Sequence, residues 1–284
     1  MIYIVLPDLE FENMSNLCRS MISAEIYSFS DFSKIKLEAP IIFNLSGKKL
    51  VRTCIEMDLN MLWEEPEFCK SLFENAKPLD NNNKISVIIS TYKRQDLLQT
   101  AVFSILNQGY PNFEIVIVGD CCPTLDYTKF KDPRIRVENM VQNSNDGGCT
   151  PKNRGLELAK GNWISYLDDD NYYLRNHFLY FYERMCTTNA VYGFSSMIMG
   201  KYNIICKEPK LYRIDTSCVI HRKDLIEKYG NWKSHKEAGY SHDYEFVSRW
   251  SNEPYFATER CTMWYNLVGS YNNPKAIYEW YGDQ

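Results

Sequence analysis

Three consecutive aspartates, Asp168, Asp169 and Asp170, directly follow a hydrophobic run over residues 163–167. Neighbouring carboxylates repel one another, and folding alone gives no reason to place three of them in a row. A divalent cation such as Mg²⁺ or Mn²⁺ would offset this repulsion, because hard cations prefer oxygen ligands. The triplet therefore predicts a metal site for a diphosphate, and a solvated acidic turn is the alternative interpretation.

The segment upstream predicts the elements that would position these acids. Ile85–Ser90 is a β-branched apolar run, typical of a strand buried on both faces. Apolar residues then recur at helical spacing over residues 97–106, and Ile115–Val118 predicts a second buried strand. A strand, a helix and a strand of these lengths form a parallel βαβ unit, which places Thr91 and Asp120 at one edge of the sheet.

The same alternation continues downstream. Arg134–Val137 predicts a third strand, and Thr150–Pro151 predicts a helix start, with threonine as the N-cap and proline in the first turn. Gly161 predicts the end of that helix, and the next strand delivers the three aspartates. Tyr92, Asp120 and the triplet can then share one rim of one sheet, which favours the metal site over the acidic turn.

Residues 84–250 resemble the inverting glycosyltransferases of family 2. This resemblance implies an α/β architecture of the GT-A (nucleotide-diphospho-sugar transferase) type, a mainly parallel twisted sheet flanked by helices. It rests on an opening strand and turn, a strand-end acid, a central helix and a DxD element, which are Val87–Arg94, Val118–Asp120, Lys152–Gly161 and Leu167–Asp170.

The family resemblance implies a role for Tyr92 and for each acid of the donor site. Tyr92 would stack on the nucleotide base, and Asp120 would accept a hydrogen bond from the base, as in uracil recognition. Asp169 would contact the ribose or the surroundings of the metal. Asp170 would ligate the Mn²⁺ or Mg²⁺ ion that bridges the diphosphate oxygens, with Asp168 as a further ligand.

Three more residues complete the expected donor site. Thr91 lies beside Tyr92 in the turn after the first strand, and Arg94 and Lys152 are candidate contacts to the diphosphate. Solvated surface charges are the alternative interpretation for the two basic residues.

The acceptor hydroxyl needs a base to remove its proton. Residues 239–250 resemble the acidic motif that opens the helix beneath the acceptor site, and Asp243 is the predicted base. Glu245 lies two residues further on and would point elsewhere. His242 replaces an acid that the family often carries, and it either orients the acceptor or is an exposed residue at the helix start.

These residues predict metal-dependent transfer of a sugar from a nucleotide donor, expected to be a UDP-sugar, to a hydroxyl of a glycan or lipid-linked acceptor. The resemblance places such a reaction in bacterial surface polysaccharide synthesis. A sugar-nucleotide nucleotidyltransferase is one alternative, but Ser90–Arg94 lacks the glycine-rich loop that such an enzyme should show. A non-catalytic glycan-binding protein on the same fold is the other, and the intact acids argue against it.

Composition limits the partners. A net charge of −4 disfavours nucleic acid. The ten cysteines show no C-x-x-C spacing, and the start of the chain lacks a signal-peptide pattern, so we expect reduced thiols and a cytoplasmic location. No apolar run reaches the ~18–20 residues of a membrane span. Any membrane contact is expected to be peripheral, at the inner face.

Two regions are expected. Residues 1–80 form an N-terminal extension of unknown role, with strands at Ile2–Leu6 and Ile41–Asn44 and a helix over Leu59–Phe73, followed by a polar linker. Self-association, partner binding and acceptor selection are candidate roles. Residues 84–284 form the glycosyltransferase domain, divided into a nucleotide-binding half (84–170) and an acceptor-binding half (171–284). The latter ends in aromatic residues expected to pack on the domain or line an acceptor cleft: Trp264, Tyr265, Tyr271, Tyr278, Trp280 and Tyr281.

Overall fold

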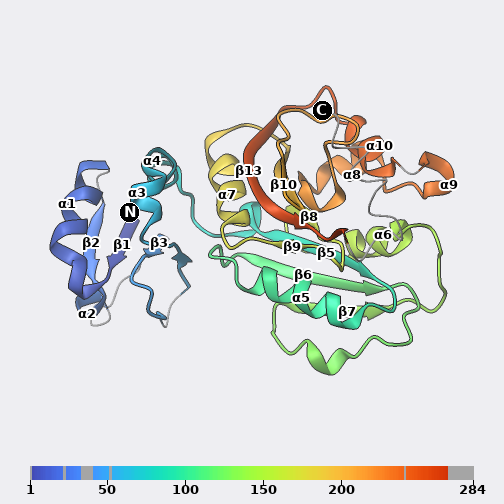
Figure 1. The fold of residues 1–284 in the computed structure, drawn as a ribbon, viewed down its shortest axis with the longest axis horizontal. Coiled ribbons are helices and arrows are strands. Elements are labelled where there is room, and N and C mark those ends of the chain that lie inside the picture. Colours follow the sequence, from blue (N-terminus) through green and yellow to red (C-terminus); the bar gives the residue numbers. More distant parts are fainter. Residues whose placement is uncertain (1, 22–23, 33–40, 51–52, 240, 268–284) are drawn as a thin grey trace.

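The computed structural model describes all residues except 1, 22–23, 33–40, 51–52, 240 and 268–284. Figure 1 shows a small sheet near the N-terminus and a larger sheet formed by the rest of the chain. The polar segment 78–84 lies between them in the sequence. Of the C-terminal aromatic residues, Tyr271, Tyr278, Trp280 and Tyr281 fall outside the described residues.

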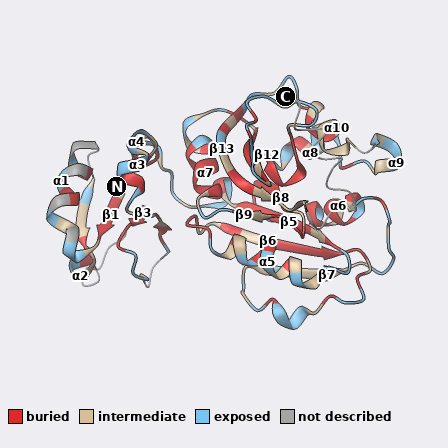
Figure 2. Cartoon of the chain, viewed as in Figure 1, coloured by how far each residue is buried: buried red, intermediate tan, exposed pale blue. Residues whose placement is uncertain are grey.

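The small sheet is entirely parallel, with the strand order β2-β1-β3-β4. Its strands β1 and β3 have the bounds that the sequence predicted, and both are almost wholly buried (Figure 2). The elements of this region are β1 (Ile2–Leu6), α1 (Phe11–Met21), β2 (Glu25–Ser28), α2 (Phe29–Phe32), β3 (Ile41–Asn44) and β4 (Ile55–Glu56).

The single helix predicted over Leu59–Phe73 is wrong, because the chain breaks at Glu65. Two helices form instead, α3 (Met61–Glu64) and α4 (Pro66–Asn75). Glu65 has φ −136° and ψ 56°, which is outside the helical region. The ring of Pro66 disfavours helical geometry in the preceding residue, and proline fits well in the first turn of the next helix.

The large sheet has the order β7-β6-β5-β8-β12-β10-β13-β9, and β11 pairs with β10. Strands β7, β6, β5 and β8 are mutually parallel, whereas β12 is antiparallel to both β8 and β10. The expected mainly parallel sheet is therefore parallel in its first four strands and mixed beyond them. The strands are β5 (Ile85–Thr91), β6 (Phe113–Gly119), β7 (Ile135–Asn139), β8 (Trp163–Tyr166), β9 (Tyr172–Tyr173), β10 (Tyr192–Met199), β11 (Tyr202–Ile204), β12 (Val219–Arg222) and β13 (Tyr255–Tyr265).

Helices cover this sheet and complete the layered α/β architecture (Figure 1). Helix α6 packs on β5 and β6, and it approaches β5 so closely that a Cβ on Gly155 would lie 2.4 Å from Ile88 Cγ2. The strands β5 and β6 are buried on both faces, as their continuous apolar sequences predict (Figure 2). The helices are α5 (Gln95–Leu106), α6 (Cys149–Leu158), α7 (His177–Thr187), α8 (Asp224–Tyr229), α9 (His235–Ala238) and α10 (His242–Ser248).

The start of α6 differs from the prediction. The helix begins at Cys149, so Thr150 lies inside it and is not the N-cap. Gly148 is the N-cap residue, and the Asp146 carboxylate, two residues before it, accepts hydrogen bonds from the backbone N–H groups of Cys149 (3.0 Å) and Thr150 (2.9 Å) at the helix start. The helix also ends at Leu158, three residues before Gly161. Gly161 is needed for another reason, since a Cβ there would lie 2.5 Å from the backbone oxygen of Lys84.

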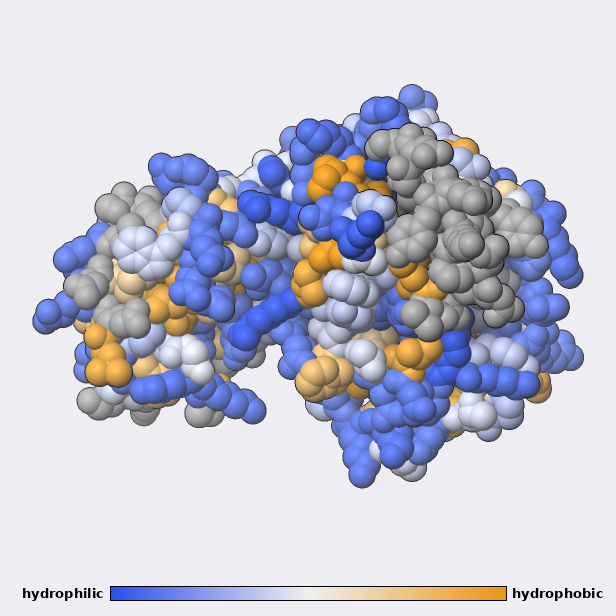
Figure 3. All heavy atoms as spheres, in the orientation of Figure 1, coloured by the Kyte–Doolittle hydropathy of each residue, from blue (hydrophilic) through white to orange (hydrophobic). Residues whose placement is uncertain are grey.

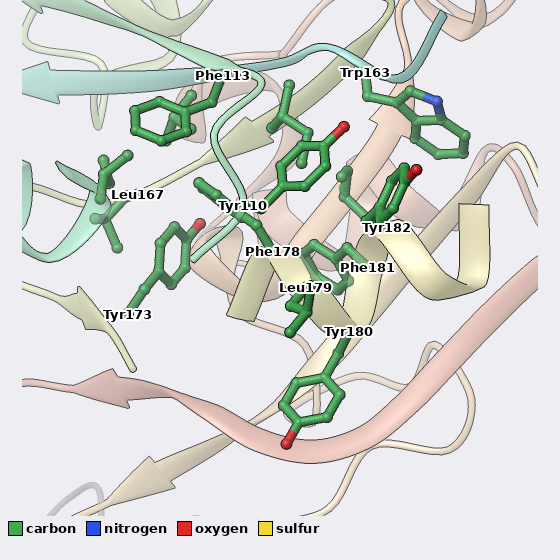
Figure 4. Packing of buried hydrophobic residues seen from close by; sticks show 14 of the residues in the cluster. Tyr110, Phe113, Trp163, Leu167, Tyr173, Phe178, Leu179, Tyr180, Phe181 and Tyr182 are labelled. Atoms are coloured by element: carbon green, nitrogen blue, oxygen red, sulfur yellow. The ribbon is translucent and has the colours of Figure 1, made fainter. Parts of the chain in front are cut away.

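Aromatic side chains of α7 pack in the core of the large-sheet region (Figure 4), and two of them also contact residues that precede β5. The rings of Tyr110 and Tyr182 are 4.7 Å apart, and the Tyr182 hydroxyl accepts a hydrogen bond from the backbone N–H of Lys77 at 2.9 Å. On the same helix, Tyr180 donates a hydrogen bond to Glu65 at 2.6 Å. Arg260 also pairs with Glu65 at 2.8 Å, so the break between α3 and α4 is bound by the large sheet's region.

Within the described ranges, every helix is too short or too polar to traverse a bilayer. The face in Figure 3 is mainly hydrophilic, with apolar residues in small groups. Scattered apolar residues of this kind are normal on a folded protein surface.

We predict that Gly109→Ala loosens the N-terminal sheet. Glu56 in β4 donates its backbone N–H to the Gly109 oxygen at 2.8 Å, and a Cβ on Gly109 would lie 2.0 Å from the Glu56 oxygen. Overpacking of this kind costs about 1–3 kcal/mol of unfolding free energy. Hydrogen exchange should rise mainly in β1 to β4. Thr100→Ala, an exposed change on α5, is the control, and equal stability of the two variants would contradict the prediction.

A second prediction concerns the cap of α6. Asp146→Ala should lower the unfolding free energy by about 0.5–2 kcal/mol at pH 7, the usual value of an N-cap. Burial alone would raise the pKa of Asp146, but hydrogen bonds from Thr150 and Ser144 hold that pKa below its ordinary value. The charged carboxylate therefore stabilises the fold above about pH 4, and this contribution is lost as the pH falls through the lowered pKa.

Urea unfolding at pH 7 and at pH 3 measures this difference. Asp96→Ala, which removes an exposed acid from the first turn of α5, serves as the matched control. A loss in Asp146→Ala that is the same at both pH values would show that the cap does not depend on the charge.

Candidate active site

One pocket of about 550 Å³ opens at the carboxyl ends of β5, β6 and β8, beside the first turns of α6 and α10. Every predicted site residue lines it: Thr91, Tyr92, Arg94, Asp120, Lys152, Asp168, Asp169, Asp170 and Asp243. The lining also includes Asp146, Asp215, Thr216, His242 and Tyr265. The structure thus brings together acids that are up to 123 positions apart in the sequence, from Asp120 to Asp243.

Strand pairing explains this convergence. Thr91 pairs with Gly119 across β5 and β6, and Asp120 donates its backbone N–H to the Thr91 oxygen at 2.9 Å. On the other side of β5, the Leu167 N–H donates to the Ile88 oxygen at 3.0 Å. Parallel neighbours end at the same edge of a sheet, so the residues that follow them become neighbours.

Two of the three aspartates are buried and bound to Arg94. The Asp169 side chain is 1% exposed; it accepts a hydrogen bond from the Thr91 hydroxyl at 2.6 Å and lies 3.2 Å from the Arg94 Nε. Asp170 forms an ion pair with the Arg94 Nη1. Burial raises the pKa of Asp169 to about 6, although Arg94 and Thr91 act in the opposite direction. A guanidinium therefore provides the positive charge between these two carboxylates.

Asp168 has a different environment. Its side chain is 30% exposed, and its Oδ1 lies 3.6 Å from the Lys152 Nζ. Its backbone N–H donates to the Ser217 hydroxyl oxygen at 3.1 Å. Asp168 is therefore the member of the triplet with the most open carboxylate, since Asp169 and Asp170 are both almost fully buried.

Lys152 is a buried counter-ion and not a solvated surface charge. Its side chain is 5% exposed, and its ammonium lies 5.2 Å from the centre of the Trp232 ring. Burial alone would lower the pKa of Lys152, but the carboxylates of Asp168 and Asp243 outweigh this effect and raise it. The positive charge of Lys152 thus acts on both Asp168, in the triplet, and Asp243, the predicted catalytic base.

The residues predicted to bind the nucleotide base, Tyr92 and Asp120, both line the pocket. The Asp120 carboxylate accepts hydrogen bonds from the Ser144 N–H (2.7 Å), the Ser144 hydroxyl (3.0 Å) and the Asn143 amide (3.1 Å). These bonds fix the carboxylate at the strand end. Tyr92 is 40% exposed, and the Lys93 ammonium lies over its ring, 4.9 Å from the ring centre.

Asp243 is the second residue of α10. The Thr216 hydroxyl donates to its Oδ1 at 2.5 Å, and the His242 Nε2 lies 3.1 Å from the same oxygen. His242 lines the pocket with a side chain only 18% exposed, so its interpretation as an exposed helix-start residue is wrong. Glu245 pairs with Arg249 and lies outside the pocket lining, in keeping with its expected direction.

Asp215 is a site residue that the sequence did not reveal. It is buried beside the pocket, and its pKa is raised well above the ordinary value by burial and by the charges of Asp168 and Asp243. Its Oδ1 accepts a hydrogen bond from the Ser217 N–H at 2.8 Å. An Asp-x-Ser turn is a common local signal, so only the pairing of β12 with β8 places this acid in the site.

The aspartate triplet supplies oxygen atoms of the kind that divalent cations prefer. Among the described residues, no group of three or more His, Cys, Asp or Glu side chains is arranged as a complete metal site. Mg²⁺ and Mn²⁺ are oxygen-ligand ions, and Mg²⁺ is usually held by one or two carboxylates together with substrate phosphates and water. The Arg94 guanidinium against Asp170 shows that a positive charge is accommodated at this point.

Two comparisons concern sequence. The family model described as Glycosyl transferase family 2 matches residues 86–249. The GalNAc(5)-diNAcBac-PP-undecaprenol beta-1,3-glucosyltransferase of Campylobacter jejuni is 29% identical over 193 residues, which cover 65% of this chain and 59% of that protein. The chain spans about half the length of the first curated relatives that it matches.

Solved structures show the same fold. Residues 1–349 of Staphylococcus aureus TarS, in complex with UDP-GlcNAc, superpose with a TM-score of 0.54 at 20% identity, covering 69% of this chain and 64% of TarS 1–349. The mannosyltransferase PcManGT from Pyrobaculum calidifontis, in complex with GDP-Man and Mn²⁺, gives 0.51 at 14% identity, with 75% and 65% covered. The expected GT-A fold is confirmed, and the chain belongs to glycosyl transferase family 2.

Proposed function

We propose that this protein is a metal-dependent, inverting glycosyltransferase that moves a sugar from a UDP-sugar to a hydroxyl of a glycan or lipid-linked acceptor. The observation that carries the proposal is that one pocket is lined by Asp120, Asp170 and Asp243 together. The names of the relatives support the coarser part, since they include a glucosyltransferase for an undecaprenol-linked glycan. Synthesis of a bacterial surface polysaccharide, at the inner face of the membrane, is the proposed setting.

The nucleotide base would bind between Tyr92 and Asp120. An ionised carboxylate has about four acceptor positions, and Asp120 uses three of them for the loop at residues 143–144. One position is left for the N–H of a uracil ring. The exposed ring of Tyr92 offers the flat face on which the base would stack.

Asp170 and Asp168 would hold the cation, and the cation would stabilise the charge of the departing diphosphate. Asp169 is already engaged by Thr91 and Arg94, so its proposed contribution is to hold the Arg94 side chain near the diphosphate rather than to contact the ribose. Lys152 would balance the acids and not touch the diphosphate, because its ammonium is buried among carboxylates.

Asp243 would remove the proton of the acceptor hydroxyl as it attacks the anomeric carbon. Its Oδ1 is already bound to Thr216 and lies near His242, so Oδ2 is the atom proposed to take the proton. Asp243 and Asp170 line the same pocket. Inversion would require the acceptor to attack from the face opposite the leaving group, with Asp243 on the side of the acceptor.

The first prediction from this proposal concerns the two acids. In a panel of nucleotide sugars assayed for hydrolysis with and without Mn²⁺, a UDP-sugar should be cleaved only with the metal. Asp170→Ala should abolish metal-dependent UDP binding in calorimetry. Asp243→Asn should keep that binding and lower turnover by at least ~10²-fold, the usual effect of losing a general base. Turnover of Asp243→Asn equal to that of the parent would remove Asp243 from this role.

The second prediction concerns Arg94. Because its guanidinium pairs with Asp170, it competes with a metal ion for that carboxylate. Arg94→Gln should therefore bind Mn²⁺ more tightly than the parent when no nucleotide is present, as measured by the electron paramagnetic resonance signal of free Mn²⁺. UDP affinity at saturating Mn²⁺ should fall about 10-fold, since a charge-assisted hydrogen bond to the diphosphate is lost.

Arg154→Gln is the matched control, because Arg154 pairs with Glu138 and Glu157 and is absent from the pocket lining. Weaker Mn²⁺ binding in Arg94→Gln than in the parent would mean that the arginine supports the cation site and does not compete with the metal.

A further inference from the structure

The short turn before β12 lies between the two halves of the proposed chemistry. Strand β12 runs antiparallel to β8, with Arg222 opposite Trp163 and Ile220 opposite Ser165. The start of β12 therefore lies beside the end of β8. As a result, residues 215–217 meet the acids that follow β8.

Ser217 contacts both ends of the segment 168–171, which contains the acid triplet. Its side chain is fully buried, and its hydroxyl oxygen accepts hydrogen bonds from the Asp168 N–H (3.1 Å) and the Asn171 side-chain amide (3.0 Å). Asp168 and Asn171 flank Asp169 and Asp170 in the sequence. One hydroxyl thus fixes the segment that carries the proposed metal ligands.

Thr216 contacts the proposed base. It is buried, and its hydroxyl donates to the Asp243 Oδ1 at 2.5 Å. This bond occupies one oxygen of the carboxylate and orients the other. The Asp215 carboxylate closes the turn by accepting the Ser217 N–H at 2.8 Å. Adjacent residues of one rigid turn therefore hold groups that arrive from β8 and from α10.

We infer that the Asp215–Ser217 turn is a positioning element that sets the distance between the metal ligands and the base, with Ser217 acting on Asp168 and Thr216 acting on Asp243. This inference rests on the proposed function and adds residues that neither the family resemblance nor the sequence pattern assigned. Such a role matters because misplacing a reacting group by about 1 Å can cost ~10²-fold in rate.

The two hydroxyls should affect different steps. Thr216→Val keeps the shape of the side chain and removes its hydrogen bond, so turnover of the UDP-sugar should fall at least ~10-fold while the calorimetric Kd for UDP with Mn²⁺ stays unchanged. Thr216→Ser should restore most of the turnover. Ser217→Ala should weaken Mn²⁺-dependent UDP binding about 10-fold, as for other groups that orient metal ligands, and change turnover at saturation much less.

Each outcome decides the inference. Parent-like turnover in Thr216→Val, equally slow Thr216→Ser, or equal losses of binding and turnover in both hydroxyl-free variants would overturn it. Urea unfolding reports the stability of each variant, and Thr216→Ala replaces Thr216→Val if the valine variant does not fold. Asp243→Asn is measured in parallel. If it is inactive while Thr216→Val is normal, only the positioning role fails; if it turns over normally, the proposed base fails, and the role of Thr216 with it.

Discussion

The constraint on which this site depends is the concentration of carboxylates in one partly buried pocket. Asp169, Asp170 and Asp215 are buried, and Asp168 and Asp243 lie beside them. Removing several like charges from water costs more than the fold can supply unless positive charges accompany them. The protein places Arg94 at one end of the cluster and Lys152 at the other. These two cations differ in exposure, because the Arg94 side chain is partly exposed and the Lys152 side chain is enclosed.

The two halves of the sheet bring different parts of the site. Parallel strands β5, β6 and β8 end at one edge and deliver the turn at Thr91, the acid at Asp120 and the aspartate triplet. The antiparallel strand β12 starts at that edge, so the turn that precedes it lies there and contacts Asp243 in α10. The proposed donor half and acceptor half are therefore linked through hydrogen bonds, because the Asp215–Ser217 turn binds Asp168 in one and Asp243 in the other.

The N-terminal region contributes to this arrangement only indirectly. All residues that line the pocket follow Ile89 in the sequence, so none of the described residues of the small sheet lines it. Its contacts include those of Glu65 with α7 and β13, of Lys77 with α7, and of Glu56 with Gly109 in the loop after α5. The N-terminal region packs against the catalytic fold but away from the pocket. We therefore still propose that it selects the acceptor or binds a partner.

The sequence by itself determined the parallel part of the fold and the acids at its edge. Buried parallel strands must be continuously apolar, so β5 and β6 were visible as runs, and the residues that end such strands must converge. The local sequence also contained the signal for the break between α3 and α4, because Pro66 disfavours helical geometry in Glu65, although a single helix was predicted there. Tertiary structure alone decided that Lys152 is enclosed by acids, that Asp146 caps α6, and that Thr216 reaches Asp243. Those contacts depend on how antiparallel strands pair and how helices pack on the sheet. A local sequence pattern does not indicate which distant side chain will contact a buried charge.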